Sequence, residues 1–197
     1  MSPTTQSEFE KAIAVVDADK SIDSLILDLR GNIGGDLSFS QTFMGLLLGP
    51  NQFAFDMFVH GAYEAQRTVS NAAIPGIKRL REIAVFTDSM SQSTAEVIAA
   101  ALKRTHMAHV VGATTRGWGS VEKVFQMQTQ LDPKQAYGIL MVVALTVRDD
   151  AQPIEGNGVI PDVSVTSVTW KSELNNYFFS PALISAIRNL AAVAPQK

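Results

Sequence analysis

Apolar residues recur at helical spacing at the start of the chain and then give way to strand-like runs. Over 9–16 they repeat every three or four residues behind a capping box at 5–8, which predicts a helix. The run "SLILDLR" at 24–30 is apolar on both faces, which predicts a strand buried on two sides. A glycine turn, "GNIGG", follows this run, and a second helix is predicted over about 36–48.

The rest of the chain alternates strand runs with helical segments. Strands are predicted at "FAFDMFV", "EIAVFTD" and "MAHVVGA", and a helix at "STAEVIAAALKR". The segments "VEKVFQMQT" and "YGILMVVALTV" predict a long hairpin with its turn near Asp132-Pro133. A last short strand is predicted in "GNGVIPDVSV", and Pro181 opens a C-terminal helix. The stretch 61–77 is predicted to be an exposed excursion or small cap, and 193–197 a frayed tail.

The order of these segments is typical of an α/β protein, in which helices flank a sheet. At 197 residues the chain is long enough to bury a full core, so we expect a single domain over 1–197. In such sheets, reacting groups gather where strand ends meet helix N-termini. We therefore expect the functional residues in the loops that follow the strands.

Composition narrows the function classes. The chain is 46% hydrophobic and 18% charged, with a net charge of −3 and no basic stripe, so we expect no nucleic-acid partner. It has no cysteine, which excludes disulfides, thiol catalysis and thiolate metal sites. No apolar run is long enough to span a bilayer, and the N-terminal segment lacks the pattern of a signal peptide. No metal-ligand cluster or phosphate-binding motif stands out, so we expect no metal and no cofactor.

The loop after the first predicted strand combines charges and glycines. Asp28 and Arg30 lie on one face, where they could pair with each other or hold neighbouring loops. Gly34 and Gly35 let the backbone come close to a ligand, and their N–H groups could point at an oxyanion. The pattern alone leaves a structural ion pair and a ligand-binding turn both open.

Two further loops offer similar alternatives. Ser93 and Glu96 have the spacing of a capping box, but a serine at a helix N-terminus is also a candidate nucleophile. In "TTRGWGSVE", Trp118 stands between Gly117 and Gly119, and a glycine-rich loop after a strand commonly carries function. Neither motif specifies a reaction by itself.

Taken together in their order and spacing, these motifs resemble those of the C-terminal processing, or tail-specific, serine protease family. "LILDLRGNIGGDL" is similar to the family's strand-and-turn signature, in which proline more often stands at the position of Ile33. "SQSTAEVIAAALK" is similar to its nucleophile segment, and "VVGATTRGWGSVE" to the loop that carries its general base. "GNGVIPDVSV" is similar to its closing Gly-x-x-Pro-Asp segment, so the likeness runs from about Ser7 to Val165.

The resemblance implies a crotonase-like or Clp-protease-like α/β fold and a serine nucleophile activated by a lysine. The nucleophile falls on Ser93 rather than on Ser91. The oxyanion hole falls on backbone N–H groups of Gly34, Gly35 and Thr94.

The position of the general base departs from the family pattern. The family's lysine aligns with Trp118, and the glutamine that usually follows it aligns with Glu122. An indole N–H only donates hydrogen bonds, so it cannot take the serine proton. Lys123 is an alternative base if it points inward with its apolar neighbours, and otherwise a solvated lysine.

Other sources of a base are also open. Distant relatives use a histidine from a strand upstream of this region, and many members carry a PDZ domain there. This chain is either a complete single domain or a fragment that lacks both. In this chain, His106 and His109 are interpreted as turn or strand-edge residues, whereas His60 lies at the end of a predicted strand and could face the cleft.

The sequence thus predicts a serine endopeptidase domain that cleaves C-terminal segments of proteins, with a non-standard or missing base. One alternative is an inactive pseudoprotease that binds extended peptides or an apolar ligand, with Trp118 as a binding surface. Another is a crotonase-type enzyme that acts on an acyl thioester. The resemblance implies a protein or peptide substrate and a periplasmic or extracytoplasmic location, and it leaves homo-oligomerisation open.

Overall fold

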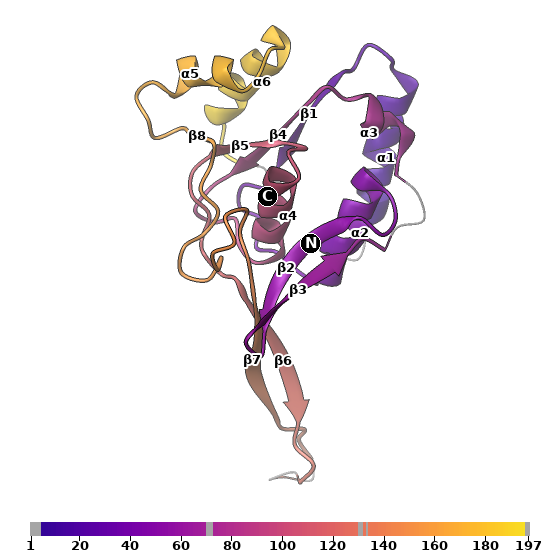
Figure 1. Cartoon of the computed structure of the whole chain (residues 1–197), viewed down its shortest axis with the longest axis vertical. Coiled ribbons are helices and arrows are strands. Elements are labelled where there is room, and N and C mark those ends of the chain that lie inside the picture. Colours follow the sequence, from indigo (N-terminus) through magenta and orange to yellow (C-terminus); the bar gives the residue numbers. More distant parts are fainter. Residues whose placement is uncertain (1–4, 70–72, 130–131, 133, 196–197) are drawn as a thin grey trace.

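The computed structural model of the chain describes residues 5–69, 73–129, 132 and 134–195 (Figure 1). The helices are α1 Thr5–Ala18, α2 Ser38–Leu48, α3 Pro75–Arg79, α4 Thr94–Arg104, α5 Trp170–Glu173 and α6 Pro181–Ala191, with a 3-10 turn η1 at Leu174–Asn176. The strands are β1 Ser24–Asp28, β2 Phe53–Val59, β3 Ala62–Arg67, β4 Glu82–Thr87, β5 His109–Gly112, β6 Ser120–Gln126, β7 Gly138–Thr146 and β8 Val163–Ser164. The mixed α/β fold that the sequence predicts is confirmed.

The first sheet has the strand order β1-β4-β5-β8 and is parallel throughout. Side chains alternate along each strand, so β4 serves two apolar layers. Ile83 and Val85 pack in the apolar cluster that includes residues of α4, whereas Ala84 and Phe86 pack in the cluster that includes residues of α6. Helices therefore cover both faces of this sheet, as is usual for parallel sheets.

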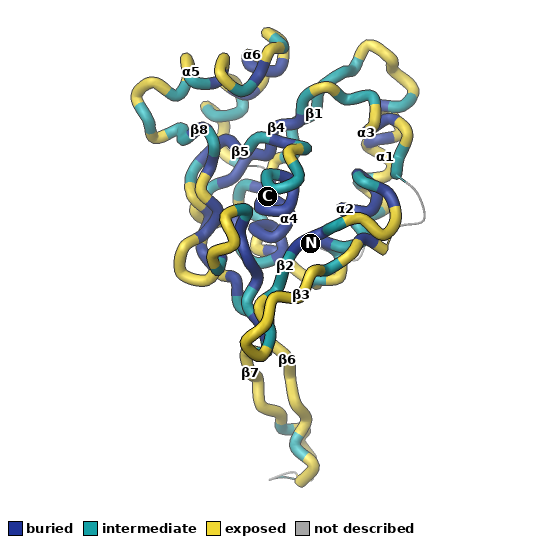
Figure 2. Tube along the Cα trace, in the orientation of Figure 1, coloured by how far each residue is buried: buried dark blue, intermediate teal, exposed yellow. Residues whose placement is uncertain are grey.

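The second sheet has the strand order β3-β2-β7-β6 and is antiparallel. β6 and β7 extend beyond β2 and leave the body of the molecule as a two-stranded arm (Figure 1). We define the arm by its paired residues, 122–126 of β6 and 138–142 of β7. Figure 2 shows these residues as exposed along almost the whole arm.

The structure differs from the sequence predictions in the stretch 61–77 and in β1. The stretch 61–77 is exposed in its first part as predicted, but it contains a regular strand, β3, because its backbone pairs with β2 while its polar side chains face solvent. β1 is half-buried rather than buried on two sides, because it is an edge strand that pairs with β4 alone among the described strands. Of the predicted hairpin turn, Pro133 lies outside the described residues.

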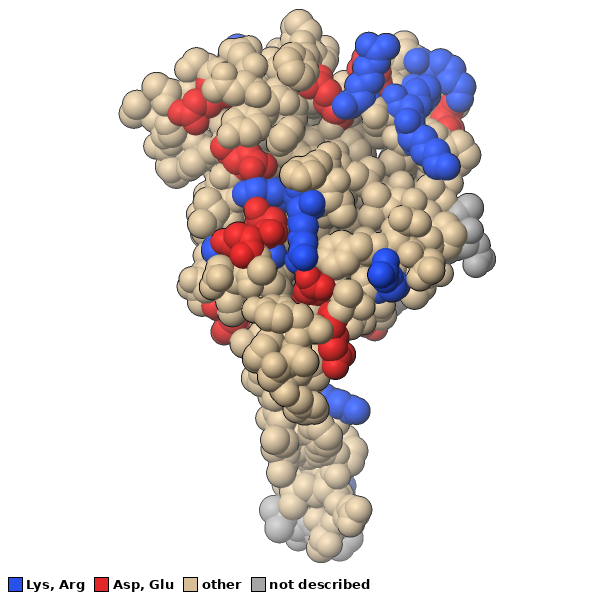
Figure 3. Space-filling model, viewed as in Figure 1, with Lys and Arg blue, Asp and Glu red and all other residues tan. Residues whose placement is uncertain are grey.

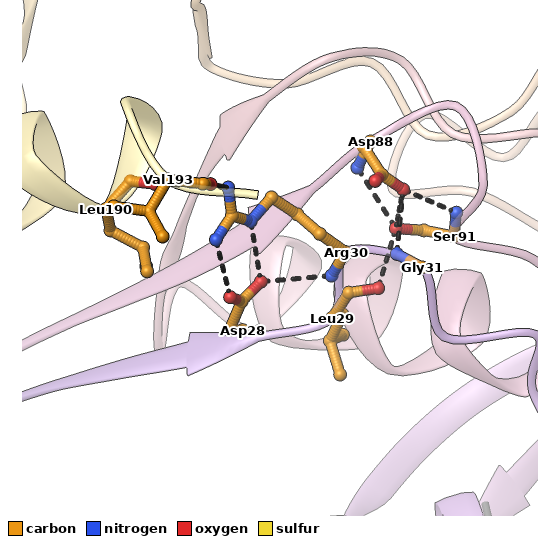
Figure 4. Close-up of polar contacts among 8 residues, drawn as sticks. All are labelled: Asp28, Leu29, Arg30, Gly31, Asp88, Ser91, Leu190 and Val193. Atoms are coloured by element: carbon orange, nitrogen blue, oxygen red, sulfur yellow. Dashed lines mark hydrogen bonds and ion pairs between the residues drawn. The ribbon is translucent and has the colours of Figure 1, made fainter. Parts of the chain in front are cut away.

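Arg30 pairs with Asp28 and also holds the C-terminal segment (Figure 4). Its Nε and Nη2 donate to the two Asp28 carboxylate oxygens at 3.0 and 2.8 Å, and its Nη1 donates to the carbonyls of Leu190 and Val193 at 3.1 and 2.8 Å. The hydrogen bonds to Asp28 raise the pKa of Arg30 above its ordinary value, so this residue stays charged. Its guanidinium carbon also lies 4.8 Å from the ring centre of Phe86.

The contacts of Arg30 change the interpretation of the C-terminal tail. The prediction of a frayed segment at 193–197 is wrong for Val193, because its carbonyl is bound by a side chain that is only 7% exposed. Residues 196 and 197 lie outside the described part of the chain. One guanidinium thus ties the loop after β1 to the end of α6.

We predict that Arg30→Met lowers the free energy of unfolding by about 2–4 kcal/mol, since it removes a bidentate ion pair and one donor from each of the carbonyls of Leu190 and Val193. Urea unfolding measures the loss, and hydrogen exchange should rise across 183–193. The matched control is Arg188→Met. Arg188 lies on α6, and its Nη2 donates to the exposed carbonyl of Lys171 at 2.7 Å. Equal effects of the two substitutions would contradict the assigned role of Arg30.

Candidate active site

The C-terminal ends of β1, β4 and β5 lie at one edge of the parallel sheet, where ligands bind in many α/β proteins. The segments that follow these strands line one cavity of about 330 Å³. Its walls come from 35–37 after β1, from Ser93 and Thr94 at the start of α4, and from Trp118 after β5. Residues 120–122 of β6 also line it. The fold thus brings together three of the motifs singled out in the sequence.

Ser93 has a strained backbone at the start of α4. Its φ of 56° and ψ of −126° are rare for a residue other than glycine. A serine on a strained turn between strand and helix is the arrangement of a nucleophile elbow, which exposes the hydroxyl at the sheet edge. Gly34, with φ +86°, lies directly against this turn: a Cβ there would be 2.7 Å from the Ser93 Cβ. Only glycine therefore allows the two loops to approach this closely.

The backbone N–H groups beside Ser93 differ in their partners. The Gly34 N–H donates to Asn32 Oδ1 at 2.9 Å and is thus engaged within its own turn. Within the described part of the chain, the N–H groups of Gly35 and Thr94 have no hydrogen-bond acceptor. The Thr94 hydroxyl donates to the Gly35 carbonyl at 2.7 Å, which ties the two segments together. Of the three amides that the family resemblance implies, Gly35 and Thr94 are available to an anion in this conformation, and Gly34 is not.

Glu96 joins the serine turn to the loop after β5. Its side chain is fully buried, and its Oε2 accepts the N–H groups of Ser93 at 2.9 Å and Trp118 at 2.8 Å. Its Oε1 accepts the Gly117 N–H at 2.7 Å and the Thr115 hydroxyl at 2.5 Å. Four donors compensate a carboxylate that would otherwise be very costly to bury. The contact to Ser93 is the capping contact that the sequence predicts, while the other three were not foreseen.

Trp118 and Glu122 contact each other at the cavity. The indole Nε1–H donates to Glu122 Oε1 at 3.1 Å, and the Ser120 hydroxyl donates to the same oxygen at 2.6 Å. Trp118 is 44% exposed, and the guanidinium carbon of Arg116 lies 5.7 Å from its ring centre. The indole is therefore an open wall of the cavity rather than a core residue.

Lys123 does not line the cavity. It is exposed, and its Nζ lies 5.5 Å from the ring centre of Phe125, farther along β6. Of the two alternatives that the sequence leaves open for Lys123, the exposed position fits the solvated lysine and not the inward-pointing base, because this part of β6 belongs to the exposed arm. The histidines are also elsewhere: His60 lies in the turn between β2 and β3, and His106 and His109 lie before and at the start of β5.

Acidic groups dominate the charge of the cavity. Asp36 accepts the Ser38 N–H at 2.8 Å, and hydrogen bonding to Ser38 lowers the pKa of its carboxyl, so Asp36 is ionised at neutral pH. Glu122 is the second carboxylate of the lining, and among the described lining residues there is no lysine, arginine or histidine. Across the described ranges, no cluster of His, Asp and Glu side chains is arranged to hold a metal ion.

Asp88 and Ser91 hold the serine turn against β1. Ser91 is fully buried, and its hydroxyl donates to the Leu29 carbonyl at 2.7 Å (Figure 4). The Asp88 carboxylate accepts the Gly31 N–H at 3.0 Å and the Ser91 N–H at 2.9 Å. Ser91 thus has a structural use, which fits the choice of Ser93 as the candidate nucleophile. The Asp-x-x-Ser spacing is typical of turns and could have revealed this role in the sequence.

The Gly-x-x-Pro-Asp segment does not line the cavity but is hydrogen-bonded to the residues that hold it. The Val159 N–H donates to Thr115 Oγ1 at 2.7 Å, and Thr115 is itself a donor to Glu96. Asp162 accepts the Val110 N–H at 2.8 Å and so fixes this segment to β5. The fourth motif therefore reaches Ser93 indirectly, through Thr115 and Glu96.

A helix-covered parallel sheet with a strained serine at its C-terminal edge is typical of α/β proteins with a serine-hydrolase type of site. Residues 1–165 match the family model described as peptidase family S41, and the chain belongs to this family. The similarity that the sequence motifs indicate is thereby confirmed at the level of the family. No described helix has both the length and the apolar character needed to cross a bilayer.

Several relatives are named as C-terminal processing proteases. The chain is 28% identical over 160 residues to a probable CtpA-like serine protease of Staphylococcus epidermidis, covering 81% of this chain and 31% of that protein. It is 27% identical over 183 residues to the carboxy-terminal processing protease CtpA of Bacillus subtilis, covering 92% and 35%. The chain thus spans about a third of the length of these curated relatives.

Solved structures support the fold. The photosystem II D1 C-terminal processing protease superposes with a TM-score of 0.65 at 21% sequence identity, over 84% of this chain and 40% of that one. A mature CPAF structure superposes with a TM-score of 0.60 at 17% identity, over 98% and 49%. At these identities the likeness supports the fold alone.

We predict that Glu96→Gln lowers the free energy of unfolding by about 2–4 kcal/mol, because an amide has one acceptor oxygen for four donors and its NH₂ would face N–H groups. Urea unfolding measures the change. Glu122→Gln is the control, since Glu122 is exposed and should change stability by no more than about 0.5 kcal/mol. An unchanged midpoint for Glu96→Gln would mean that this carboxylate does not hold the loop.

Proposed function

We propose that this chain is a serine peptidase domain of the C-terminal processing type, with Ser93 as its nucleophile. The observation that carries the proposal is a strained serine beside two amides, Gly35 and Thr94, that have no acceptor among the described residues, all in one cavity. Membership of peptidase family S41 and relatives named as carboxy-terminal processing proteases support it. By analogy with those relatives, the substrates are proteins cut near their C-termini.

In this proposal the reaction begins with attack of the Ser93 hydroxyl oxygen on a peptide carbonyl carbon. The carbonyl oxygen gains negative charge, and the N–H groups of Gly35 and Thr94 donate to it. The Thr94 N–H also belongs to the first turn of α4, where the helix dipole favours an anion. Glu96 acts as a positioning residue, since it fixes the Ser93 N–H and the neighbouring loop.

Among the described side chains that line the cavity there is no amine or imidazole to take the serine proton, and the two carboxylates, Asp36 and Glu122, are weaker bases. The Trp118 N–H is a donor and is bound to Glu122, and the lining has no lysine or histidine in its described part. Loss of a general base typically costs about 10²–10⁴-fold in rate. We therefore propose a slow peptidase, or one whose base is supplied from outside this chain.

A fluorophosphonate probe tests the nucleophile, because the serine oxygen displaces fluoride from its phosphorus and leaves a stable adduct. We expect slow labelling that disappears in Ser93→Ala and persists in Ser185→Ala, an exposed serine on α6. Intact-mass measurement gives the stoichiometry, and peptide mapping gives the site. Labelling that survives Ser93→Ala would refute the role of Ser93. A complete absence of labelling in the folded protein, both unmodified and with Trp118→Lys and Glu122→Gln combined, would refute it as well.

The second candidate function is a pseudoprotease that binds peptides without cleaving them. The observation that favours it is the exposed indole of Trp118 at the cavity, where the resemblance implies the lysine of active members. Aromatic side chains often anchor binding interfaces. In this case the cavity would retain a peptide, and Trp118 would provide part of its contact surface.

Substitution at Trp118 separates the two candidates. We predict that Trp118→Lys combined with Glu122→Gln raises probe labelling by about 10²-fold or more, since it supplies an amine without an adjacent carboxylate. The rate should increase with pH as the ammonium loses its proton. Trp118→Met with Glu122→Gln is the control that opens the cavity without a base.

An equal gain in both double variants would point to relief of steric blocking rather than to a restored base. No gain in either would remove the interpretation of Trp118 as a replaced lysine. Peptide binding that is lost in Trp118→Met, in a protein that Ser93 probes never label, would favour the pseudoprotease.

A further inference from the structure

The two-stranded arm presents an unusual surface. Its six apolar side chains are between 43% and 66% exposed: Val124, Phe125, Ile139, Leu140, Met141 and Val142. The face of the arm seen in Figure 3 carries few charged side chains. A two-stranded hairpin is marginally stable in water, and exposed apolar surface of this kind usually marks an interaction site.

The backbone of the arm also has an edge that is not paired with another described strand. β6 is the edge strand of its sheet, so one side of β6 has no strand partner among the described residues. An edge strand of this length without proline invites pairing with another strand. The partner must add backbone hydrogen bonds along β6 and extend the apolar faces.

The sequence of β6 is suited to pair with a second copy of itself. We propose that two copies of this chain form a dimer by antiparallel pairing of their β6 strands, with the two-fold axis at Val124. Such an axis is perpendicular to the sheet, so two residues that lie opposite each other have their side chains on the same face. Residues on one face of a strand are an even number of positions apart, and the axis must therefore pass beside a residue rather than between two residues.

Charge selects this register among the alternatives. A centre at Lys123 or at Glu122 would place like charges directly opposite each other, which is destabilising. A centre at Phe125 would oppose Val124 to the polar Gln126. A centre at Val124 places valine opposite valine. It avoids the two like-charge pairs and the pairing of Val124 with Gln126.

The pairs in the Val124-centred register are chemically matched. Lys123 of each copy lies opposite Phe125 of the other, which extends the cation–π contact already present within one strand. On the other face, Val124 is paired with Leu140 of its own β7. The dimer therefore gains a continuous apolar row, Leu140 and Val124 of one copy followed by Val124 and Leu140 of the other.

The same register brings the second copy close to the candidate active site. Glu122 lines the cavity and, in the dimer, lies opposite Gln126 of the second copy. The amide of this glutamine can donate to the Glu122 carboxylate. The dimer would thus contribute one polar group to the mouth of the cavity, independently of whether the site cleaves peptides.

Opposite charges at the axis test the proposal on the full chain. Sedimentation equilibrium should show a dimer for the unmodified protein, and Val124→Lys or Val124→Glu alone should weaken it by about tenfold or more. An equimolar mixture of the two variants should recover the dimer. Circular dichroism checks that each variant remains folded. A purely structural role for Val124 would not give recovery on mixing.

Single cysteines give a second, independent measurement, because the chain has none of its own. Val124→Cys should form a disulfide-linked dimer on mild oxidation, since directly opposed residues have Cβ atoms about 4.5–5.5 Å apart. In Glu122→Cys the two sulfurs would be offset by four residues, roughly 13 Å, and should not link.

A monomeric protein at about 100 μM, a dimer that tolerates Val124→Lys, or equal cross-linking at both cysteine positions would overturn the proposal. A monomer that gains order on adding an extended peptide would instead assign β6 to a peptide strand.

Discussion

The buried carboxylate of Glu96 is the interaction on which the candidate site depends. A carboxylate with no exposed surface must be compensated by donors, and the fold supplies four of them from two separate segments. Two of these donors, the N–H groups of Ser93 and Trp118, belong to residues that line the cavity. The strained backbone of Ser93 can persist because its own N–H is bound in this way and because Gly34 leaves room for it.

Elements with strong local patterns were predicted well, and those defined by distant partners were not. The helix over 94–104 and the strand over 82–87 follow directly from their apolar spacing. The apolar run of β7 predicted a strand just as clearly, yet it gave no sign that its first five residues would be exposed. Exposure depends on whether another sheet or helix covers the strand, and local periodicity does not contain this information. The same limit hid the contact from Arg30 to the end of α6.

The candidate site could be predicted only in part from the sequence, for the same reason. The order of the motifs indicated the segments that meet, and the cavity is lined by Ser93, Gly35, Thr94 and Trp118. The engagement of the Gly34 N–H by Asn32 depends on the detailed shape of one turn, which composition does not fix. Glu96 was recognisable only as a capping residue, because its other three donors follow about 20 residues later.

Trp118 and Glu122, the two residues that the family resemblance aligns with the base position, are chemically matched to each other. A lysine works as a general base only when it is neutral, and an adjacent carboxylate favours its charged form. Glutamine avoids that penalty, so glutamate beside a catalytic lysine would be counterproductive. Beside an indole a carboxylate is the better neighbour, because it is a stronger acceptor for the N–H than an amide oxygen. Here the Trp118 Nε1–H donates to Glu122 Oε1 at 3.1 Å. The pair is therefore suited to holding the indole at the cavity wall rather than to moving a proton.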